Sequence, residues 1–217
     1  MSKKYELVKS DTNEFLGKTL YRVKYLRDGK YFSKGELGGY VESENNLSQG
    51  NDACVSGNAF VYGDARVFGD AWVFGDARVF GDAHVYGNAW VYGDAHVSGN
   101  AKVYDDACVS GNAKVYGNAW VYGDAHVYGN AWVYGNACVS GDAHVYGNAW
   151  VYGDVKVDFV LCSRFNFYKQ EQIKKWLELE KQFEKELKME GVEKWVGRNI
   201  NCWKVIQKSF LAGPFTE

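Results

Sequence analysis

Histidine and cysteine are the residue types in this chain best suited to do chemistry. There are four histidines and five cysteines. Histidine can act as a general base near neutral pH, and both residue types ligate zinc. One series is regularly spaced, because eighteen residues separate each member from the next: Cys108, His126 and His144. Whether that spacing brings the side chains together depends on the element that carries them.

An unbroken six-residue repeat surrounds these residues. From Asn51 to Asp158 the chain divides into eighteen units that read Gly, Asp or Asn, Ala, x, Val, y. Ala and Val are two residues apart, so on a short strand both face one side while x faces the other. Gly followed by Asp or Asn predicts a sharp corner. The repeat therefore predicts a solenoid with a narrow core of Ala and Val.

This repeat resembles the left-handed parallel β-helix of hexapeptide-repeat proteins, in which three units form one triangular coil. The resemblance implies a mainly β fold in which residues 51–158 make about six coils. It also implies that residues eighteen apart in the sequence stack on one face of the solenoid.

Residues 1–50 are expected to form a β cap at the N-terminal end of the solenoid. Without a cap, that end would expose strand edges and apolar core. Two apolar-rich runs, Tyr5–Val8 and Thr19–Leu26, lie on either side of Gly17 and predict a β-hairpin. An irregular first coil is expected from about Gly38. Within it, Val41 and Leu47 continue the six-residue register of Ala53.

The C-terminal residues 159–217 predict an α-helical region. Apolar residues recur at helical spacing from about Tyr168 to Glu190, and Gly191 predicts the end of that helix. A second helix is expected to carry Trp195, Val196, Ile200, Trp203, Ile206 and Phe210.

Composition and charge exclude several classes of protein. Residues 51–158 carry five basic and twelve acidic side chains, a net charge of −7, which disfavours binding to nucleic acid phosphates. The odd number of cysteines, with no Cys-x-x-Cys pair, predicts reduced thiols at Cys54, Cys108, Cys138, Cys162 and Cys202. No apolar run resembles a membrane span or a signal peptide, so a cytoplasmic location is expected.

The hexapeptide-repeat resemblance implies one enzyme class, the acyltransferases that use coenzyme A and a histidine base. The four histidines, however, all occupy the outward x position that other units fill with Trp, Arg, Lys, Phe or Cys: His84, His96, His126 and His144. No loop leaves the repeat to wall a pocket. We therefore assign no catalytic residue and expect no cofactor, and a coenzyme A-dependent acyltransferase is the alternative hypothesis.

A metal site is a separate hypothesis. If residues eighteen apart stack, Cys108, His126 and His144 become neighbours on one face. The γ-class carbonic anhydrases, which share the implied fold, bind zinc through histidines of adjacent subunits. A flat ladder points its side chains in parallel rather than toward one centre, so no metal is assigned.

The outward positions also carry many aromatic residues. Position y is Tyr or Phe in most units, and folding the sequence at eighteen places Trp72 over Trp90 on one face and Trp132 over Trp150 on another. Contiguous exposed aromatic surface indicates an interface, although stacked rings can also simply stabilise adjacent strands. The candidate binding residues are Trp72, Trp90, Trp120, Trp132, Trp150, Tyr134 and Tyr152.

The N-terminal stretches 18–28 and 34–48, joined to the repeat, resemble uncharacterised bacteriophage and prophage proteins that are often labelled transferases on the repeat alone. The resemblance does not extend to the tail from Phe159 onward. The aromatic faces predict a non-enzymatic protein-binding solenoid. The resemblance implies that it docks on a host bacterial protein and inhibits it, for example a component of antiviral defence. A homo-oligomer, either a dimer or a trimer, and a location in the host cytoplasm are expected.

Overall fold

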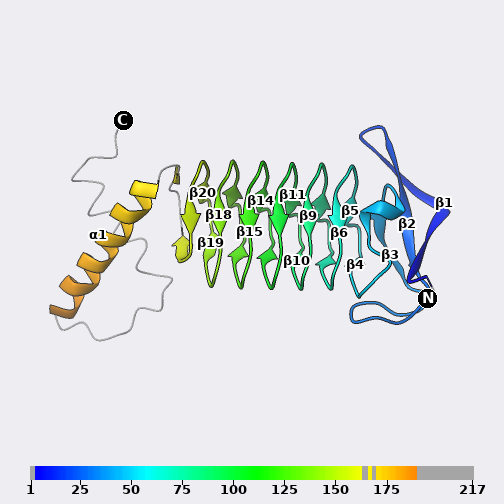
Figure 1. Cartoon of the computed structure of the whole chain (residues 1–217), viewed down its shortest axis with the longest axis horizontal. Coiled ribbons are helices and arrows are strands. Elements are labelled where there is room, and N and C mark those ends of the chain that lie inside the picture. The colour runs from blue at the N-terminus through cyan, green and yellow to red at the C-terminus, as the bar shows by residue number, and fades with distance from the viewer. Residues whose placement is uncertain (1–2, 163–165, 168–169, 190–217) are drawn as a thin grey trace.

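The protein is a parallel β-solenoid of about seven turns, described here from a computed structural model. The structure describes residues 3–162, 166–167 and 170–189. The N-terminal strands lie at one end of the solenoid and the helix lies at the other (Figure 1). No helix among these residues is long and apolar enough to cross a membrane.

Three sheets form the faces of the solenoid, and each takes one short strand from every regular turn. Face 1 is the ten-stranded sheet of β1 (Tyr5–Phe15), β2 (Lys18–Tyr25), β3 (Leu37–Val41), β5 (Phe60–Val61), β8 (Arg78–Val79), β11 (His96–Val97), β14 (Lys114–Val115), β17 (Trp132–Val133), β20 (Trp150–Val151) and β23 (Asn166–Phe167). Face 2 comprises β4 (Cys54–Val55), β7 (Trp72–Val73), β10 (Trp90–Val91), β13 (Cys108–Val109), β16 (His126–Val127), β19 (His144–Tyr146) and β22 (Val160–Cys162). Face 3 comprises β6 (Arg66–Val67), β9 (His84–Val85), β12 (Lys102–Val103), β15 (Trp120–Val121), β18 (Cys138–Val139) and β21 (Lys156–Val157).

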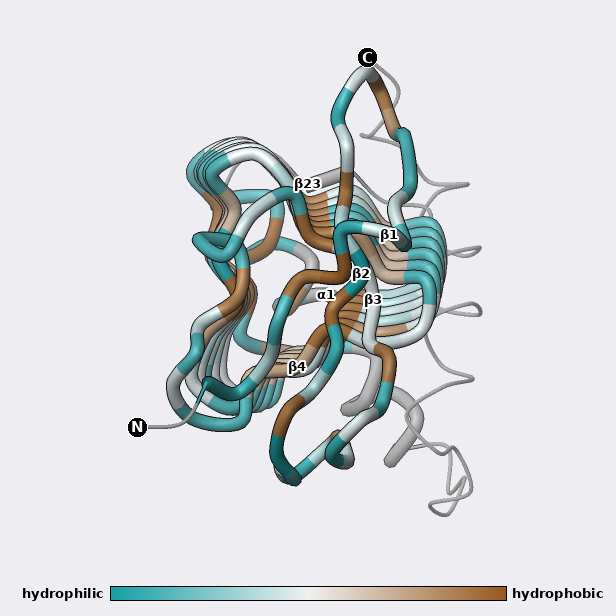
Figure 2. Tube along the Cα trace, turned by 90° about the vertical axis from the view of Figure 1, so that its right-hand side faces the viewer, coloured by the Kyte–Doolittle hydropathy of each residue, from teal (hydrophilic) through white to brown (hydrophobic). Residues whose placement is uncertain are grey.

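The predicted stacking at eighteen residues is confirmed through the regular coils. Trp72 pairs with Trp90, and Trp132 pairs with Trp150, each in a parallel register. Ala and Val of every unit from Ala53 to Val151 are buried and form one continuous core. Viewed along the solenoid, the corners are hydrophilic and the coils superimpose (Figure 2). The left-handed sense of the coil stays a prediction.

Glycine is required at the corners because φ is positive there and because successive corners are in close contact. Gly117, for example, has a φ of 70°, and a Cβ built on it would lie 3.0 Å from the amide nitrogen of Gly135 in the next coil. Two units have no glycine at this position. Asn51 and Asp105 replace it with φ of 51° and 58°, in keeping with the tolerance of these residue types for the left-handed region.

The irregular first coil is confirmed, but its register differs from the expected one. Val41 pairs with Val61 and Leu47 with Val67, so both take the Val position of a unit and are twenty residues from their partners. Two extra residues therefore separate Leu47 from Ala53. Because side chains alternate along a strand, a shift of two residues leaves the same side chains facing the core. The short helix η1 (Glu44–Asn46) lies in this coil.

The last coil is shorter, and the solenoid continues beyond the expected boundary at Asp158. Val145 pairs with Leu161 and Val151 with Phe167, each sixteen residues on. The sequence analysis assigned residues 159–167 to the helical region because the six-residue pattern ends there. Strand pairing continues nevertheless, since β22 supplies an apolar residue, Leu161, that is buried in the core.

One helix, α1 (Gln170–Met189), follows the last coil and confirms the first predicted helix to within two residues. Ile173 is buried in the core cluster, and Leu177 packs against that cluster. The Gln170 side chain accepts a hydrogen bond from the Lys156 amide (2.8 Å) and donates one to the Lys156 carbonyl (3.2 Å). The start of α1 thus covers this end of the core and satisfies an open edge of face 3. The predicted second helix lies outside the described residues.

At the other end, the predicted hairpin of β1 and β2 is confirmed, and it extends only face 1. On the remaining faces, side chains replace the missing strand. The Tyr25 hydroxyl accepts from the Val55 amide (2.9 Å) and donates to the Val55 carbonyl (3.0 Å). The Asn46 amide donates to the carbonyls of Gly63 (2.8 Å) and Ala65 (2.9 Å). These bonds satisfy edge groups that would otherwise be buried without partners.

Lys4 performs the same role with a buried ammonium group. Its Nζ donates to the carbonyl of Ala53 at 2.6 Å, and the side chain is fully buried. Burial, and after it the charge of Arg27, lower the pKa of Lys4 to about 8. The Ala53 carbonyl at the sheet edge therefore gains a hydrogen bond, but the charged ammonium group of Lys4 loses its contact with water.

The corner geometry predicts that Gly117→Ala destabilises the solenoid by about 1–3 kcal/mol, because the new Cβ contacts the next coil and alanine strains the positive φ. Gly50→Ala is the matched control, since its Cβ would lie 3.6 Å from the nearest atom, Ser48 Oγ. Chemical unfolding measures both variants. Equal losses in the two would contradict the proposed corner packing.

The lowered pKa of Lys4 predicts a pH dependence of stability. Between pH 8 and the ordinary Lys pKa of 10.5, the unfolded chain binds more protons at Lys4 than the folded chain does. This contribution to the free energy of unfolding therefore rises with pH in that window. The difference in unfolding free energy between the wild type and Lys4→Met should shift in favour of the wild type from pH 7 to pH 10. A difference that does not change with pH would show that Lys4 titrates normally.

Candidate functional site: the aromatic and cationic faces of the solenoid

The y positions form ladders of parallel rings. On face 1, Tyr116 stacks on Tyr134 with ring centroids 4.8 Å apart, and Tyr134 stacks on Tyr152 at 4.9 Å. The planes of these pairs lie within 5° of parallel. Such stacking follows from the coil spacing, which brings equivalent side chains of adjacent strands into contact. Ser98 interrupts the ladder of face 1 and separates these tyrosines from the N-terminal rings.

Trp132 and Trp150 form a second column beside these tyrosines on face 1. Their rings stack at 5.1 Å with planes 9° apart, and Trp150 is 38% exposed. The Nζ of Lys114 lies 4.7 Å from the ring centroid of Trp132. We call this set the face 1 platform, and it comprises Lys114, Tyr116, Trp132, Tyr134, Trp150 and Tyr152.

The N-terminal rows of the same face are covered by the hairpin. Phe15, at the end of β1, packs edge-on against Phe60 (5.2 Å) and Tyr62 (5.8 Å). Tyr62 is only 7% exposed as a result. One face therefore carries both a covered aromatic surface and an exposed one.

The predicted tryptophan pair on face 2 has a different environment. Trp72 and Trp90 are neighbours, but their planes are 75° apart at a centroid distance of 5.7 Å. Tyr31 stacks on Trp72 at 4.7 Å, and Trp72 donates a hydrogen bond to Ser56 (2.8 Å). The N-terminal cap thus covers Trp72, whereas Trp90 is 39% exposed.

Trp120 stands apart from the other predicted residues, on face 3. It is 43% exposed, and its column neighbours are Lys102 and Cys138. The Lys102 Nζ lies 4.9 Å from its ring centroid. The structure therefore distributes the five predicted tryptophans over three faces, and only Trp132 and Trp150 form a flat stacked pair.

The ladder of Cys108, His126 and His144 forms in the register that the sequence indicates. The imidazole rings of His126 and His144 stack at 4.8 Å with planes 29° apart. Burial raises the pKa of the Cys108 thiol and lowers the pKa of His126. Within the part of the chain that the structure describes, no three His, Cys, Asp or Glu side chains are grouped so that they could hold a metal ion.

Two columns of cationic residues share one order, which the sequence analysis missed. Along face 3 the x residues are Arg66, His84 and Lys102, followed by Trp120. Face 1 repeats this order with Arg78, His96 and Lys114, followed by Trp132. The signal was present in the sequence, as an Arg, His, Lys, Trp series at intervals of eighteen residues.

The histidine in each column is less basic than usual. Burial lowers the pKa of His84, and Arg66 and Lys102 lower it further, while Asp82 acts in the opposite direction. His96 has a lowered pKa for the same reasons, with burial first and then Arg78 and Lys114. At neutral pH each column therefore presents two cations with a neutral imidazole between them.

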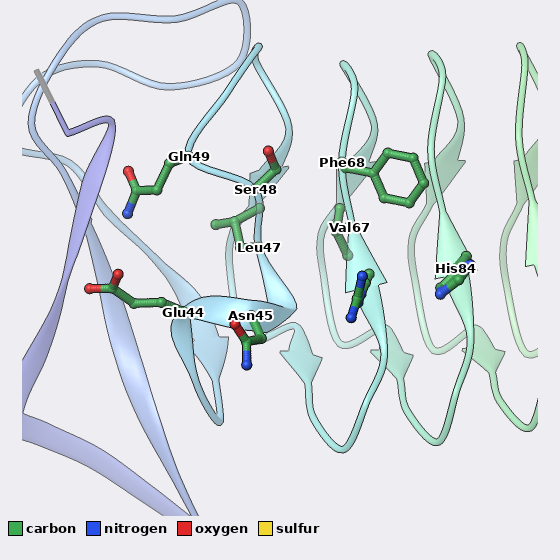
Figure 3. Close-up of a pocket in the computed structure, with 9 residues that line it drawn as sticks. Glu44, Asn45, Leu47, Ser48, Gln49, Val67, Phe68 and His84 are labelled. Carbon is green, nitrogen blue, oxygen red and sulfur yellow. The ribbon is translucent and has the colours of Figure 1, made fainter. Parts of the chain in front are cut away.

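The face 3 column begins in a groove of about 460 Å³. Asn45, Ser48 and Gln49 of the first coil lie on one side, and Phe68 and His84 of the next coils lie on the other (Figure 3). Arg66 also lines the groove. The two extra residues of the first coil lie between Leu47 and Ala53, beside this groove. The sequence predicted an irregular first coil but not this groove, because Leu47 was placed in the six-residue register of Ala53, without the two extra residues.

Comparison with known proteins supports the class of this chain. The YdcK β-solenoid repeat model matches residues 59–75, 83–99 and 113–129, all within the regular coils and together less than half of the chain. The chain is thus a β-solenoid repeat protein. No curated protein matches the sequence.

Proposed function

We propose that this protein is a non-enzymatic binding protein that docks on a protein partner through the face 1 platform. The observation that carries the proposal is the contrast along face 1, where Tyr62 is 7% exposed under the hairpin while Trp150 is 38% exposed on the platform. Tryptophan and tyrosine dominate the binding energy of protein interfaces. The rigid coils hold these rings in place, which lowers the entropy cost of binding.

The N-terminal cap supports this proposal because it shows how such a surface is covered. Phe15 contacts the rings of Phe60 and Tyr62, and Tyr31 stacks on Trp72, so in both cases an aromatic side chain of another segment supplies the contact. A partner protein is expected to do the same on Trp132 and Trp150. Lys114 adds a positive charge beside these rings.

The kind of partner follows from the resemblance of the N-terminal stretches to bacteriophage proteins. It supports a host bacterial protein, for example a component of antiviral defence, which docking would inhibit in the host cytoplasm. A second copy of the chain is the competing occupant, and a dimer or trimer would then bury the platform. Light scattering of the purified protein distinguishes the two.

The test is a pull-down from bacterial lysate with the tagged chain, comparing the wild type with the Trp132→Ser and Trp150→Ser double variant. We expect one stoichiometric protein with the wild type and at least a tenfold loss with the double variant, because two hot-spot rings are removed. Trp120→Ser is the matched control on face 3 and should retain the partner. Mass spectrometry reads each lane.

The thermal stability of the double variant distinguishes a binding surface from a ladder of rings that only stabilises the coils. Stacking of one ring pair contributes about 1 kcal/mol, so the thermal midpoint of the double variant should fall by only a few degrees. A collapse of the midpoint would mean that the rings hold the coils together. Retention of the partner by the double variant would place binding elsewhere on the molecule.

A further inference from the structure

A second surface, on face 3, has the chemistry of a binding site for anions. Arg66 is exposed, and neither Arg66 nor Lys102 forms an ion pair with any residue that the structure describes. Several basic residues of the cap differ in this respect. Lys18 is 2.6 Å from Glu42 and Arg27 is 3.1 Å from Asp52. Like charges in one column repel weakly, and a bound anion would relieve that repulsion.

On face 1 the hairpin covers the first residue of the equivalent column. Arg78 lies 4.7 Å from the ring centroid of Phe15, beneath the hairpin. On face 3 the matching residue, Arg66, is exposed and lines the groove instead. His84 lines the same groove (Figure 3). The arginine that begins each series is therefore covered on face 1 and accessible on face 3.

We propose that the groove and the column of Arg66, His84 and Lys102 bind an acidic, extended segment of polypeptide. One carboxylate would lie at Arg66 in the groove and a second at Lys102, two coils on and about 10 Å away at the usual strand spacing. Arg66 can bind a carboxylate with two parallel hydrogen bonds. His84 lies between the two cations and can donate a hydrogen bond to the segment.

The surroundings of the column favour a peptide over a nucleic acid. Asp64 and Asp82 lie at the corner on one side, and Asp105 and Asp106 lie at the corner on the other. The positive strip is thus only one side chain wide. A continuous phosphate backbone would meet these acids at every turn, whereas carboxylates on separate side chains can reach Arg66 and Lys102 individually.

The aromatic residues beside the column point to the same ligand. Phe68 stacks on Tyr86 at 4.8 Å and Tyr86 on Tyr104 at 4.9 Å, with planes within 3° of parallel. Because much of each ring face contacts its neighbour, these rings are poor platforms for stacked bases. Glu44, the acid at the groove, is 3.1 Å from Lys3. That ion pair reduces its repulsion of an incoming carboxylate.

The test uses fluorescent hexaglutamate and a fluorescent thymidine oligonucleotide, with binding to the full chain followed by anisotropy at low salt. We expect hexaglutamate to bind, and the Arg66→Gln and Lys102→Gln double variant to lose at least tenfold in affinity. Lys156→Gln removes one positive charge, as each single substitution does, from the far end of face 3, three coils beyond Lys102, and should change affinity less than twofold. Salt should weaken binding.

A second readout keeps the test valid if the double variant is unstable. NMR titration of the wild type should show that bound hexaglutamate raises the pKa of His84. The pKa of His126 on face 2 should not change. No binding of hexaglutamate, tighter binding of the oligonucleotide, or an equal loss in Lys156→Gln would overturn the proposal. The Trp132→Ser and Trp150→Ser variant should still bind hexaglutamate, so failure of this site and failure of the face 1 platform are distinguishable.

Discussion

The structure depends on the closure of each coil after eighteen residues, with Ala and Val facing inward. This constraint places every strand against an identical strand of the next coil, so that the amide of Trp132 donates to the carbonyl of Ala149 at 2.9 Å and the pattern repeats along the solenoid. It also fixes what lies outside, because an outward residue must stand beside its counterpart eighteen residues away. Columns of rings and of cations are therefore consequences of core packing. The residue types in these columns can change without disturbing the core, so they can determine what the protein binds.

A repeating coil has two open ends, and the same constraint explains how they are closed. Only face 1 receives additional strands from the N-terminus, so Tyr25 and Asn46 satisfy the open edge groups of the other faces. At the far end Gln170 binds both backbone groups of Lys156. The cap also covers the first rows of aromatic residues on faces 1 and 2. Face 3 receives no such cover beyond η1, and its first rows open into the groove.

Local pattern was enough to predict the coils, the buried residues and the pairing of Trp132 with Trp150, because the repeat has one period and no insertion. The register of the first coil was mispredicted, since a shift of two residues leaves the alternation of side chains unchanged and only the partner of Leu47 reveals it. The roles of Tyr25 and Lys4 depend on contacts with residues thirty to fifty positions away, which no local pattern encodes. The groove arises from that same shift and was missed with it.

The central claim is that Trp150 lies at the centre of a protein interface. Photo-crosslinking tests it most directly, with Trp150→p-benzoylphenylalanine compared with Trp120→p-benzoylphenylalanine, since Trp120 is equally exposed but lies on face 3. The account predicts one crosslinked protein from position 150 and no equivalent product from position 120. Equal crosslinking from both positions, or none from position 150, would contradict it.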